Sequence, residues 1–93
     1  MRDIKRSDGC YFVGETLTTA QAIIRFHRSG CDILVIDHTF VSENLKGQGI
    51  GAQLVMEVVN LARREKAKIQ ALCPFAIKML RRNPEYADVL APE

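Results

Sequence analysis

The sequence contains no tryptophan, and aromatic residues make up only 6% of it. Proteins that bind single-stranded nucleic acids usually combine exposed aromatic rings with a strongly basic groove. This chain has two tyrosines, four phenylalanines and a formal net charge of only +2. These scarcities argue against a nucleic-acid partner.

The sequence also lacks a long apolar segment and a metal-binding cysteine pattern. No stretch approaches the roughly 18 apolar residues that cross a bilayer, so we expect no membrane partner. The charged start, MRDIKRSDG, lacks the apolar core of a secretion signal. Cys10, Cys31 and Cys73 are widely spaced without a CxxC pair, which indicates neither a zinc site nor a disulfide framework. We therefore expect an intracellular, cytoplasmic protein without a metal.

The 93 residues are enough for one hydrophobic core but too few for two. With 47% hydrophobic and 26% charged residues, the composition is typical of a globular protein. We expect a single domain over residues 1–93.

The first 44 residues have the pattern of an antiparallel meander. Ser7-Asp8-Gly9 is a turn signal between two short extended runs, and Ser29-Gly30 marks a second turn. The β-branched and apolar residues at 33–36 and 40–41 favour a well-buried strand. Three to four antiparallel strands are therefore predicted.

After residue 46 the hydrophobic period changes from 2 to 3.6. Ile50, Leu54, Val58 and Leu61 fall on one face of a helix predicted over about 49–66, and Val55 and Ala62 widen that face. A short buried strand over 67–73 and a second helix from Pro74 follow. Asn83-Pro84 ends this helix, and residues 84–90 form a last irregular or helical turn. The fold class predicted is α+β.

The stretch LKGQGIGAQL, residues 45–54, places three glycines on alternate positions where the helix begins. Gly47, Gly49 and Ala52 also satisfy the GxGxxG/A pattern of dinucleotide-binding proteins. That pattern belongs after the first strand of a parallel β-α-β unit, whereas here three antiparallel strands precede it. We therefore reject the dinucleotide reading and interpret the loop as a binding site for another phosphate group, held by backbone amides and a helix N-terminus.

Lys46-Gly47-Gln48-Gly49-Ile50-Gly51 resembles the acetyl-CoA motif Arg/Gln-x-x-Gly-x-Gly/Ala of the GNAT superfamily of N-acetyltransferases. The order of meander, glycine loop, helix and short strand is the order found in that superfamily. Over residues 33–90, the Leu-Cys-Pro-Phe and Asn-Pro-Glu-Tyr pieces resemble the small, single-domain YjdJ-type GNAT-like acetyltransferases. Lys46 departs from the usual Arg or Gln but still offers a positive charge.

The resemblance implies a minimal GNAT-like fold with a parallel-type strand after the first helix, and acetyl-CoA as co-substrate. The loop would bind the pyrophosphate of CoA, and the pantetheine would pair with the end of the preceding strand at Phe40 and Val41, where a backbone amide could polarise the acetyl carbonyl. The sheet would splay around Val41 and open a slot toward Cys73. The expected cofactor-binding residues are Phe40, Val41, Lys46, Gly47, Gln48, Gly49, Ile50, Gly51 and Ala52.

Larger members of the superfamily often carry an Asn at the end of the next strand and, seven residues later, a Tyr that protonates the leaving thiolate. Here Cys73 stands in the place of the Asn and Leu80 in the place of the Tyr. A leucine cannot donate a proton, so Cys73 becomes the first catalytic candidate. It precedes a helix N-terminus, which lowers the pKa of a thiol. It could carry the acetyl group as a thioester, or only protonate and orient; it could also be a buried structural cysteine.

His38 is the second catalytic candidate, as a general base. Strand alternation would put His38 and Phe40 on one face, and Asp37, Thr39 and Val41 on the other. A structural histidine is the competing interpretation. Asp37 is expected to cap or pair locally, His27 to be exposed, Cys10 and Cys31 to pack within strands, and the ring of Tyr86 to pack at the helix break.

Full-length members of the superfamily build much of the acceptor site from two helices between their first two strands. Here the hairpin passes almost directly to the next strand, so an open groove is expected. Such a groove fits a large or flexible amine acceptor, such as a protein lysine or a polyamine. The sequence thus predicts an acetyl-CoA-dependent N-acetyltransferase with an unidentified acceptor. The alternative is a CoA-binding module without catalysis.

Overall fold

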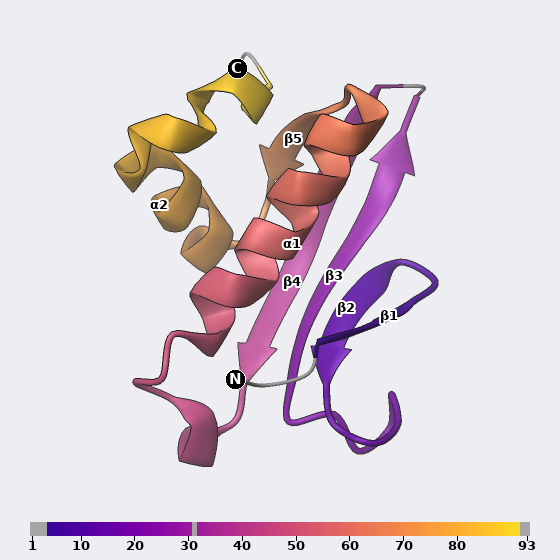
Figure 1. Ribbon diagram of the computed structural model, residues 1–93, viewed down its shortest axis with the longest axis vertical. Coiled ribbons are helices and arrows are strands. Elements are labelled where there is room, and N and C mark those ends of the chain that lie inside the picture. The colour runs from indigo at the N-terminus through magenta and orange to yellow at the C-terminus, as the bar shows by residue number, and fades with distance from the viewer. Residues whose placement is uncertain (1–3, 31, 92–93) are drawn as a thin grey trace.

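The computed structural model describes residues 4–30 and 32–91. Its strands are β1 (Lys5–Ser7), β2 (Cys10–Val13), β3 (Ala22–Ser29), β4 (Ile33–Val41) and β5 (Lys68–Ala71). Two α-helices, α1 (Ile50–Glu65) and α2 (Pro74–Arg82), alternate with the later strands. Two 3₁₀ segments, η1 (Glu43–Leu45) and η2 (Pro84–Val89), precede α1 and follow α2 (Figure 1).

The five strands form one sheet in chain order, β1-β2-β3-β4-β5. The first four are antiparallel neighbours, and β5 joins β4 in parallel after the α1 crossover. Gly9, with φ of 72°, makes the turn of the first hairpin. The predicted α+β class, the antiparallel meander and the parallel-type last strand are all confirmed.

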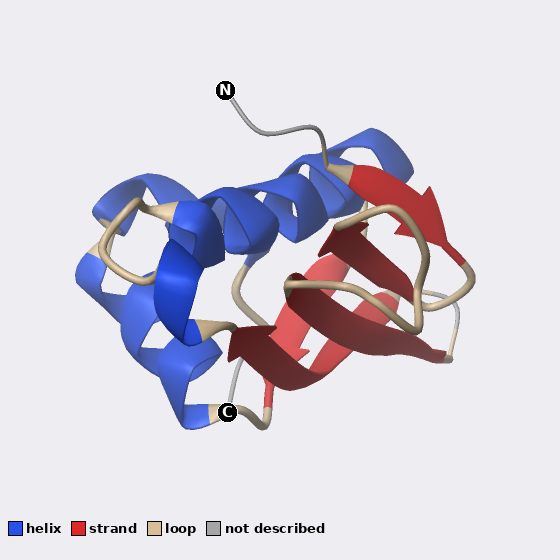
Figure 2. Cartoon of the chain, turned by 90° about the horizontal axis from the view of Figure 1, so that it is seen from below, coloured by secondary structure: helices blue, strands red, loops and turns tan. Residues whose placement is uncertain are grey.

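The helices gather on one side of the sheet, as Figure 2 shows. Every residue of the predicted apolar stripe of α1 is buried. This stripe packs on inward-facing strand residues such as Ile24, Leu34, Ile36 and Ile69. The opposite face of the sheet, which we call the outer face, carries a smaller apolar cluster of Cys10, Phe12 and Ile23. Cys10 packs within its strand as expected, whereas Cys31 lies outside the described residues.

The predicted element bounds hold closely for the helices. Gly49 and Lys66, the predicted ends of the first helix, are its N-cap and C-cap residues. The second helix begins at Pro74 as predicted, and the turn after Asn83 is the 3₁₀ segment η2. The strand expected over 67–73 is shorter, because its last residues turn into α2. In the part of the chain that the structure describes, no helix is long and apolar enough to cross a membrane.

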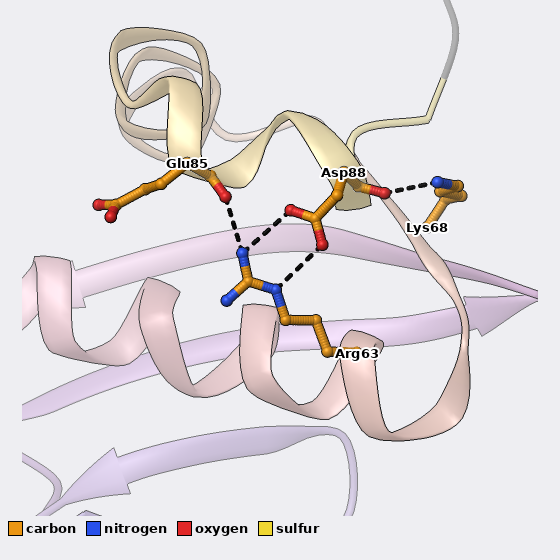
Figure 3. Close-up of polar contacts among 4 residues, drawn as sticks. All are labelled: Arg63, Lys68, Glu85 and Asp88. Atoms are coloured by element: carbon orange, nitrogen blue, oxygen red, sulfur yellow. Dashed lines mark hydrogen bonds and ion pairs between the residues drawn. The ribbon is translucent and has the colours of Figure 1, made fainter.

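Charged side chains from the end of α1 and the start of β5 bind η2 through an ion pair and hydrogen bonds (Figure 3). The Arg63 guanidinium donates to both carboxylate oxygens of Asp88, at 3.1 and 3.0 Å, and to the carbonyl oxygen of Glu85 at 2.7 Å. The Lys68 ammonium donates to the carbonyl oxygen of Asp88. The hydrogen bond from Arg63 holds the pKa of Asp88 below its ordinary value. We call these four residues the C-terminal clamp.

The C-terminal clamp makes the free energy of unfolding depend on pH in acidic solution. Because the folded-state pKa of Asp88 is lowered, its contribution is present above the ordinary carboxyl pKa, about 4, and is lost as the pH falls through the lower folded value. We expect Asp88→Asn to lower the Tm at pH 7 and the difference from the unmodified protein to close below about pH 4. Thermal unfolding at both pH values measures this, with Glu85→Gln as control because only the backbone of Glu85 contacts Arg63. A Tm difference that stays constant down to pH 2 would contradict the role of the carboxylate.

Candidate active site

The site begins where β4 separates from β5. The two strands pair from Ile33 with Lys68 to Ile36 with Ala71, and one further hydrogen bond joins the Leu72 amide to the Ile36 carbonyl. Beyond Ile36, β4 remains paired with β3 as far as Val41, but β5 has turned away into α2. The separation thus starts at Asp37 rather than around Val41, which corrects the predicted position. It leaves about five residues of β4 with an unpaired edge.

A β-bulge lies at the start of this unpaired edge. Arg25 pairs with His38 and Phe26 with Ile36, so that Asp37 is the extra residue of β4. The carboxylate of Asp37 reaches Nδ1 of His27 on the neighbouring strand, at 2.7 Å. Because His27 projects from the outer face, Asp37 lies on that face beside His38. The bulge therefore breaks the predicted alternation at Asp37, while the local pairing of Asp37 and the exposure of His27 agree with expectation.

The direction of the backbone amides along the unpaired edge follows from one hydrogen bond next to it. The Ser42 amide donates to the Gln21 carbonyl at the β3 side, at 2.8 Å. Alternation then turns the amides of Thr39 and Val41 to the opposite side, toward the gap left by β5. The Thr39 amide indeed acts on the thiol of Cys73 across this gap. The Val41 amide therefore faces the gap as an available donor.

The glycine loop adds a second set of amides. Gly47 and Gly49 have φ of 82° and 76°, left-handed conformations that favour glycine, and Gly49 is the N-cap of α1. Gln53 is the residue whose amide donates to the Gly49 carbonyl. The amides of the preceding first turn of α1 have no acceptor within the helix, and they carry the positive end of its dipole. An anion is the natural ligand of this arrangement.

The unpaired edge and the glycine loop enclose one cavity of about 530 Å³. Its walls include eight of the nine residues predicted to bind the cofactor. They are Phe40, Val41, Lys46, Gly47, Gly49, Ile50, Gly51 and Ala52. Gln48 is the exception, because its side-chain amide turns back to the carbonyl of Asn44 at 3.1 Å. A cavity lined in this way fits an extended ligand with an anionic group at the α1 end and hydrogen-bonding groups along β4.

Four further residues line the cavity that the sequence did not single out: Thr39, Leu45, Phe75 and Met79. Phe75 packs so closely on Gly51 that a Cβ at Gly51 would lie 2.6 Å from the tip of the ring. Phe75 and Met79 are four residues apart, a spacing that puts both on one face of α2 and could have indicated this wall. Thr39 lies two residues before Val41 and therefore on the same face of β4, so the alternation of side chains along a strand could have identified it.

Lys46 lines the cavity, but its ammonium group already forms an ion pair. Its ammonium lies 3.0 Å from the carboxylate of Glu43, and both side chains are exposed. Exposed pairs of this kind contribute little to stability and exchange partners readily. The backbone amides of the loop therefore carry most of the attraction for an anion.

Cys73 is the N-cap residue of α2 and is 9% exposed. Burial acts to raise the pKa of its thiol, but the amides of Ala76 and Phe75, with the hydroxyl and amide of Thr39, favour the thiolate and lower the pKa overall. The predicted lowering of the pKa at a helix N-terminus is thus found. Cys73 does not itself line the cavity; Thr39, which does, stands beside it.

His38 is exposed and projects from the outer face, opposite Arg25. The two predicted catalytic side chains are therefore not brought into contact, since Thr39 and Cys73 lie on the inner side of β4. Leu80, in the place of the usual Tyr, is buried in the core, and the ring of Tyr86 packs in the same core at the helix break, as expected. Among the described residues, no cluster of His, Cys, Asp and Glu side chains could hold a metal ion.

The model of one protein family matches residues 10–89, and its description is GCN5-related N-acetyl-transferase. A GCN5-like protein of Staphylococcus aureus, with a solution structure determined by NMR, is 36% identical and has a TM-score of 0.85. That comparison covers 98% of this chain and 89% of the other. The chain belongs to the GCN5-related N-acetyltransferase family, whose members transfer an acetyl group from acetyl-CoA.

More distant structures share the fold. Rv2747 from Mycobacterium tuberculosis, solved in complex with CoA, is 18% identical with a TM-score of 0.63, over 80% of this chain and 46% of that protein. A ribosomal-protein-alanine N-acetyltransferase from Brucella melitensis is 15% identical with a TM-score of 0.61, over 95% of this chain and 65% of that one. No protein with a curated description matches the chain.

The left-handed conformation of Gly49 gives a test of the loop. A Cβ at Gly49 would meet no neighbour, so the cost of a side chain there is a backbone cost alone. We expect Gly49→Ala to lower the free energy of unfolding by about 1 kcal/mol, and Gly49→Asn to lower it less, because asparagine tolerates this conformation. Urea unfolding of the two variants measures the difference. Equal losses for Ala and Asn would show that backbone strain is not the cause.

Proposed function

We propose that this protein is an acetyl-CoA-dependent N-acetyltransferase, with residues 1–93 acting as one catalytic unit. The observation that carries the proposal is the meeting, in one cavity, of the β4 edge that β5 leaves unpaired, with its Val41 amide, and the first-turn amides of the α1 N-terminus. The first would pair with the pantetheine, and the second would hold the pyrophosphate. We assign the nine predicted residues, Gln48 through its backbone, to this binding site. The proposal includes the YjdJ-type subfamily and a cytoplasmic location.

In the proposed reaction, the acetyl carbonyl lies at the Val41 amide, which stabilises the negative charge that develops on its oxygen. The Cys73 thiolate attacks the acetyl carbon; a carbon–sulfur bond to Cys73 forms, the bond to CoA breaks, and CoA leaves as a thiolate that takes a proton from solvent. The lowered pKa of Cys73 supports this nucleophilic role over that of a proton donor.

The second half of the reaction regenerates the enzyme. The acceptor amine attacks the acetyl-Cys73 carbon, its nitrogen–carbon bond forms, and Cys73 leaves again as a thiolate. We assign the proton released by the amine to His38, which stands on the outer face at the separation of the strands. Residues 4–30 form only strands and turns in the structure, so helices between these strands do not cover that face. This openness supports a large or flexible acceptor such as a protein lysine or a polyamine.

A second candidate function is a CoA-binding module without transfer. The observations that favour it are the burial of Cys73 away from the cavity wall and the buried Leu80 where a proton-donating Tyr would stand. The two functions share the cavity and differ in the chemistry at Cys73.

Calorimetric titration tests the cavity assignment. We expect CoA and acetyl-CoA to bind with similar affinity, because both carry the pyrophosphate and pantetheine, and NAD to produce no heat of binding. Gly51→Trp should abolish the binding of both CoA forms, because its side chain would compete with Phe75 for the cavity wall. Gly30→Trp, at a turn far from the loop in sequence where an added Cβ would meet no neighbour, is the control for the introduced ring. Failure of both CoA forms to bind the unmodified protein would refute the proposed function.

Variants of the two catalytic candidates separate transfer from binding. We expect Cys73→Ala to bind CoA normally, to gain no acetyl mass with acetyl-CoA and to lose turnover by at least about a hundredfold, as expected for loss of a nucleophile. His38→Asn should still gain the acetyl mass but lose turnover, because only the second half-reaction needs the base. Intact mass spectrometry and release of CoA measure both steps. Full turnover in Cys73→Ala would exclude the covalent route, and absence of turnover in the unmodified protein with any amine would favour the binding module.

A further inference from the structure

Thr39 occupies a position that the two assigned catalytic residues do not fill. Thr39 lines the cavity, whereas Cys73 does not. Both its hydroxyl and its backbone amide act on the Cys73 sulfur. Thr39 is therefore a cavity residue that acts on the buried thiol through its side chain as well as its backbone, whereas Phe75, which also lines the cavity, acts through its amide alone.

The hydroxyl of Thr39 is not needed for a hydrogen bond elsewhere in the described part of the chain. Its oxygen is inaccessible to solvent and finds no hydrogen-bond partner of ordinary geometry among the described residues. Leaving a hydroxyl buried without a partner costs stability, so a valine would be the better residue for packing alone. A neutral thiol is a weak acceptor and a thiolate a strong one, so the hydroxyl gains a full partner only when Cys73 is ionised.

The hydrogen bonds that favour the thiolate come from backbone amides and one hydroxyl, and not from charged side chains. Burial has the largest influence on the pKa of the thiol and raises it. The amides of Ala76 and Phe75, and the hydroxyl and amide of Thr39, lower it. The titratable side chains on the elements around the thiol are Asp37 and His38 on β4, Lys68 on β5, Glu57, Arg63, Arg64 and Glu65 on α1, and Lys78, Arg81 and Arg82 on α2. Asp37 and His38 project from the outer face, and Lys68 stands at the far end of β5 and contacts Asp88.

We propose that Thr39 is a positioning residue: its hydroxyl donates a hydrogen bond to the Cys73 thiolate and orients that sulfur beside the cavity. This inference rests on the proposed function for its purpose, since a thiolate turned toward the cavity serves acetyl transfer. The hydroxyl adds to three backbone amides that favour the thiolate, those of Ala76 and Phe75 from α2 and that of Thr39 from β4. The sulfur is then fixed between helix and strand without any charged partner.

The test is the pH profile of Cys73 alkylation by iodoacetamide, followed at this cysteine by peptide mass spectrometry. Thr39→Val has the same shape and lacks the hydroxyl. We expect it to move the midpoint of the profile upward by about one pH unit, so that alkylation at neutral pH slows about tenfold, the effect of one lost hydrogen bond to a charged group. Thr39→Ser keeps the donor and should keep the midpoint. The midpoint, unlike the rate, does not depend on how easily the reagent enters.

A second measurement separates this role from folding and from the proposed function. Thermal unfolding should show Thr39→Val at least as stable as the unmodified protein, because the variant removes an unpaired buried hydroxyl. CoA titration of the same variant reports on the cavity independently of the thiol. An unchanged midpoint in Thr39→Val would overturn the inference, whether or not CoA binds; absence of CoA binding to the unmodified protein would refute the proposed function and leave the alkylation result standing.

Discussion

The structure depends on one constraint, the separation of β4 from β5 after Ile36. Up to that point the two strands share a parallel ladder, and beyond it β4 continues alone, still paired with β3 on its other side. An unpaired strand edge inside a folded protein is costly where its backbone groups find no partner. On this edge the Thr39 amide acts on Cys73, and the Val41 amide faces the gap. The cavity beside this edge supplies the place for such a partner. A ligand that can complete the ladder is therefore favoured by the backbone itself, before any side chain is considered.

The same separation explains the unusual setting of Cys73. Since β5 ends early, the chain turns into α2 directly at the gap, and the first amides of α2 point back toward the cysteine. Burial opposes ionisation of the thiol, while these amides and Thr39 favour it, and the second influence prevails. Hydrogen bonds, rather than a neighbouring histidine, thus lower the pKa of this thiol. His38 stands on the other face of β4, which is why we propose it for a different step.

Much of this could be predicted from the sequence, because the signals are local. The 3.6 period between Ile50 and Ala62 fixed the buried face of α1, and the glycines before it marked both its start and the loop. The bulge at Asp37 could not be predicted, since a bulge arises from the register with β3, which the sequence of β4 alone does not give. The role of Thr39 was missed for a related reason. A threonine on a strand is ordinary until the position of β5 shows that its hydroxyl has nothing to bind except the sulfur of Cys73.

The two faces of β4 divide the proposed chemistry between them. The inner face and the unpaired edge meet the glycine loop, so the acetyl donor belongs to the helical side of the sheet. The outer face carries His38, Asp37 and the exposed ring of Phe40, and we propose this side for the amine. The gap left by β5 is where the two sides meet, and Cys73 and Thr39 stand at that gap. An acetyl group held on Cys73 would need to move only across the thickness of one strand to pass from donor to acceptor. A small domain with a single helical layer can therefore keep its two substrates apart without the additional helices of larger relatives.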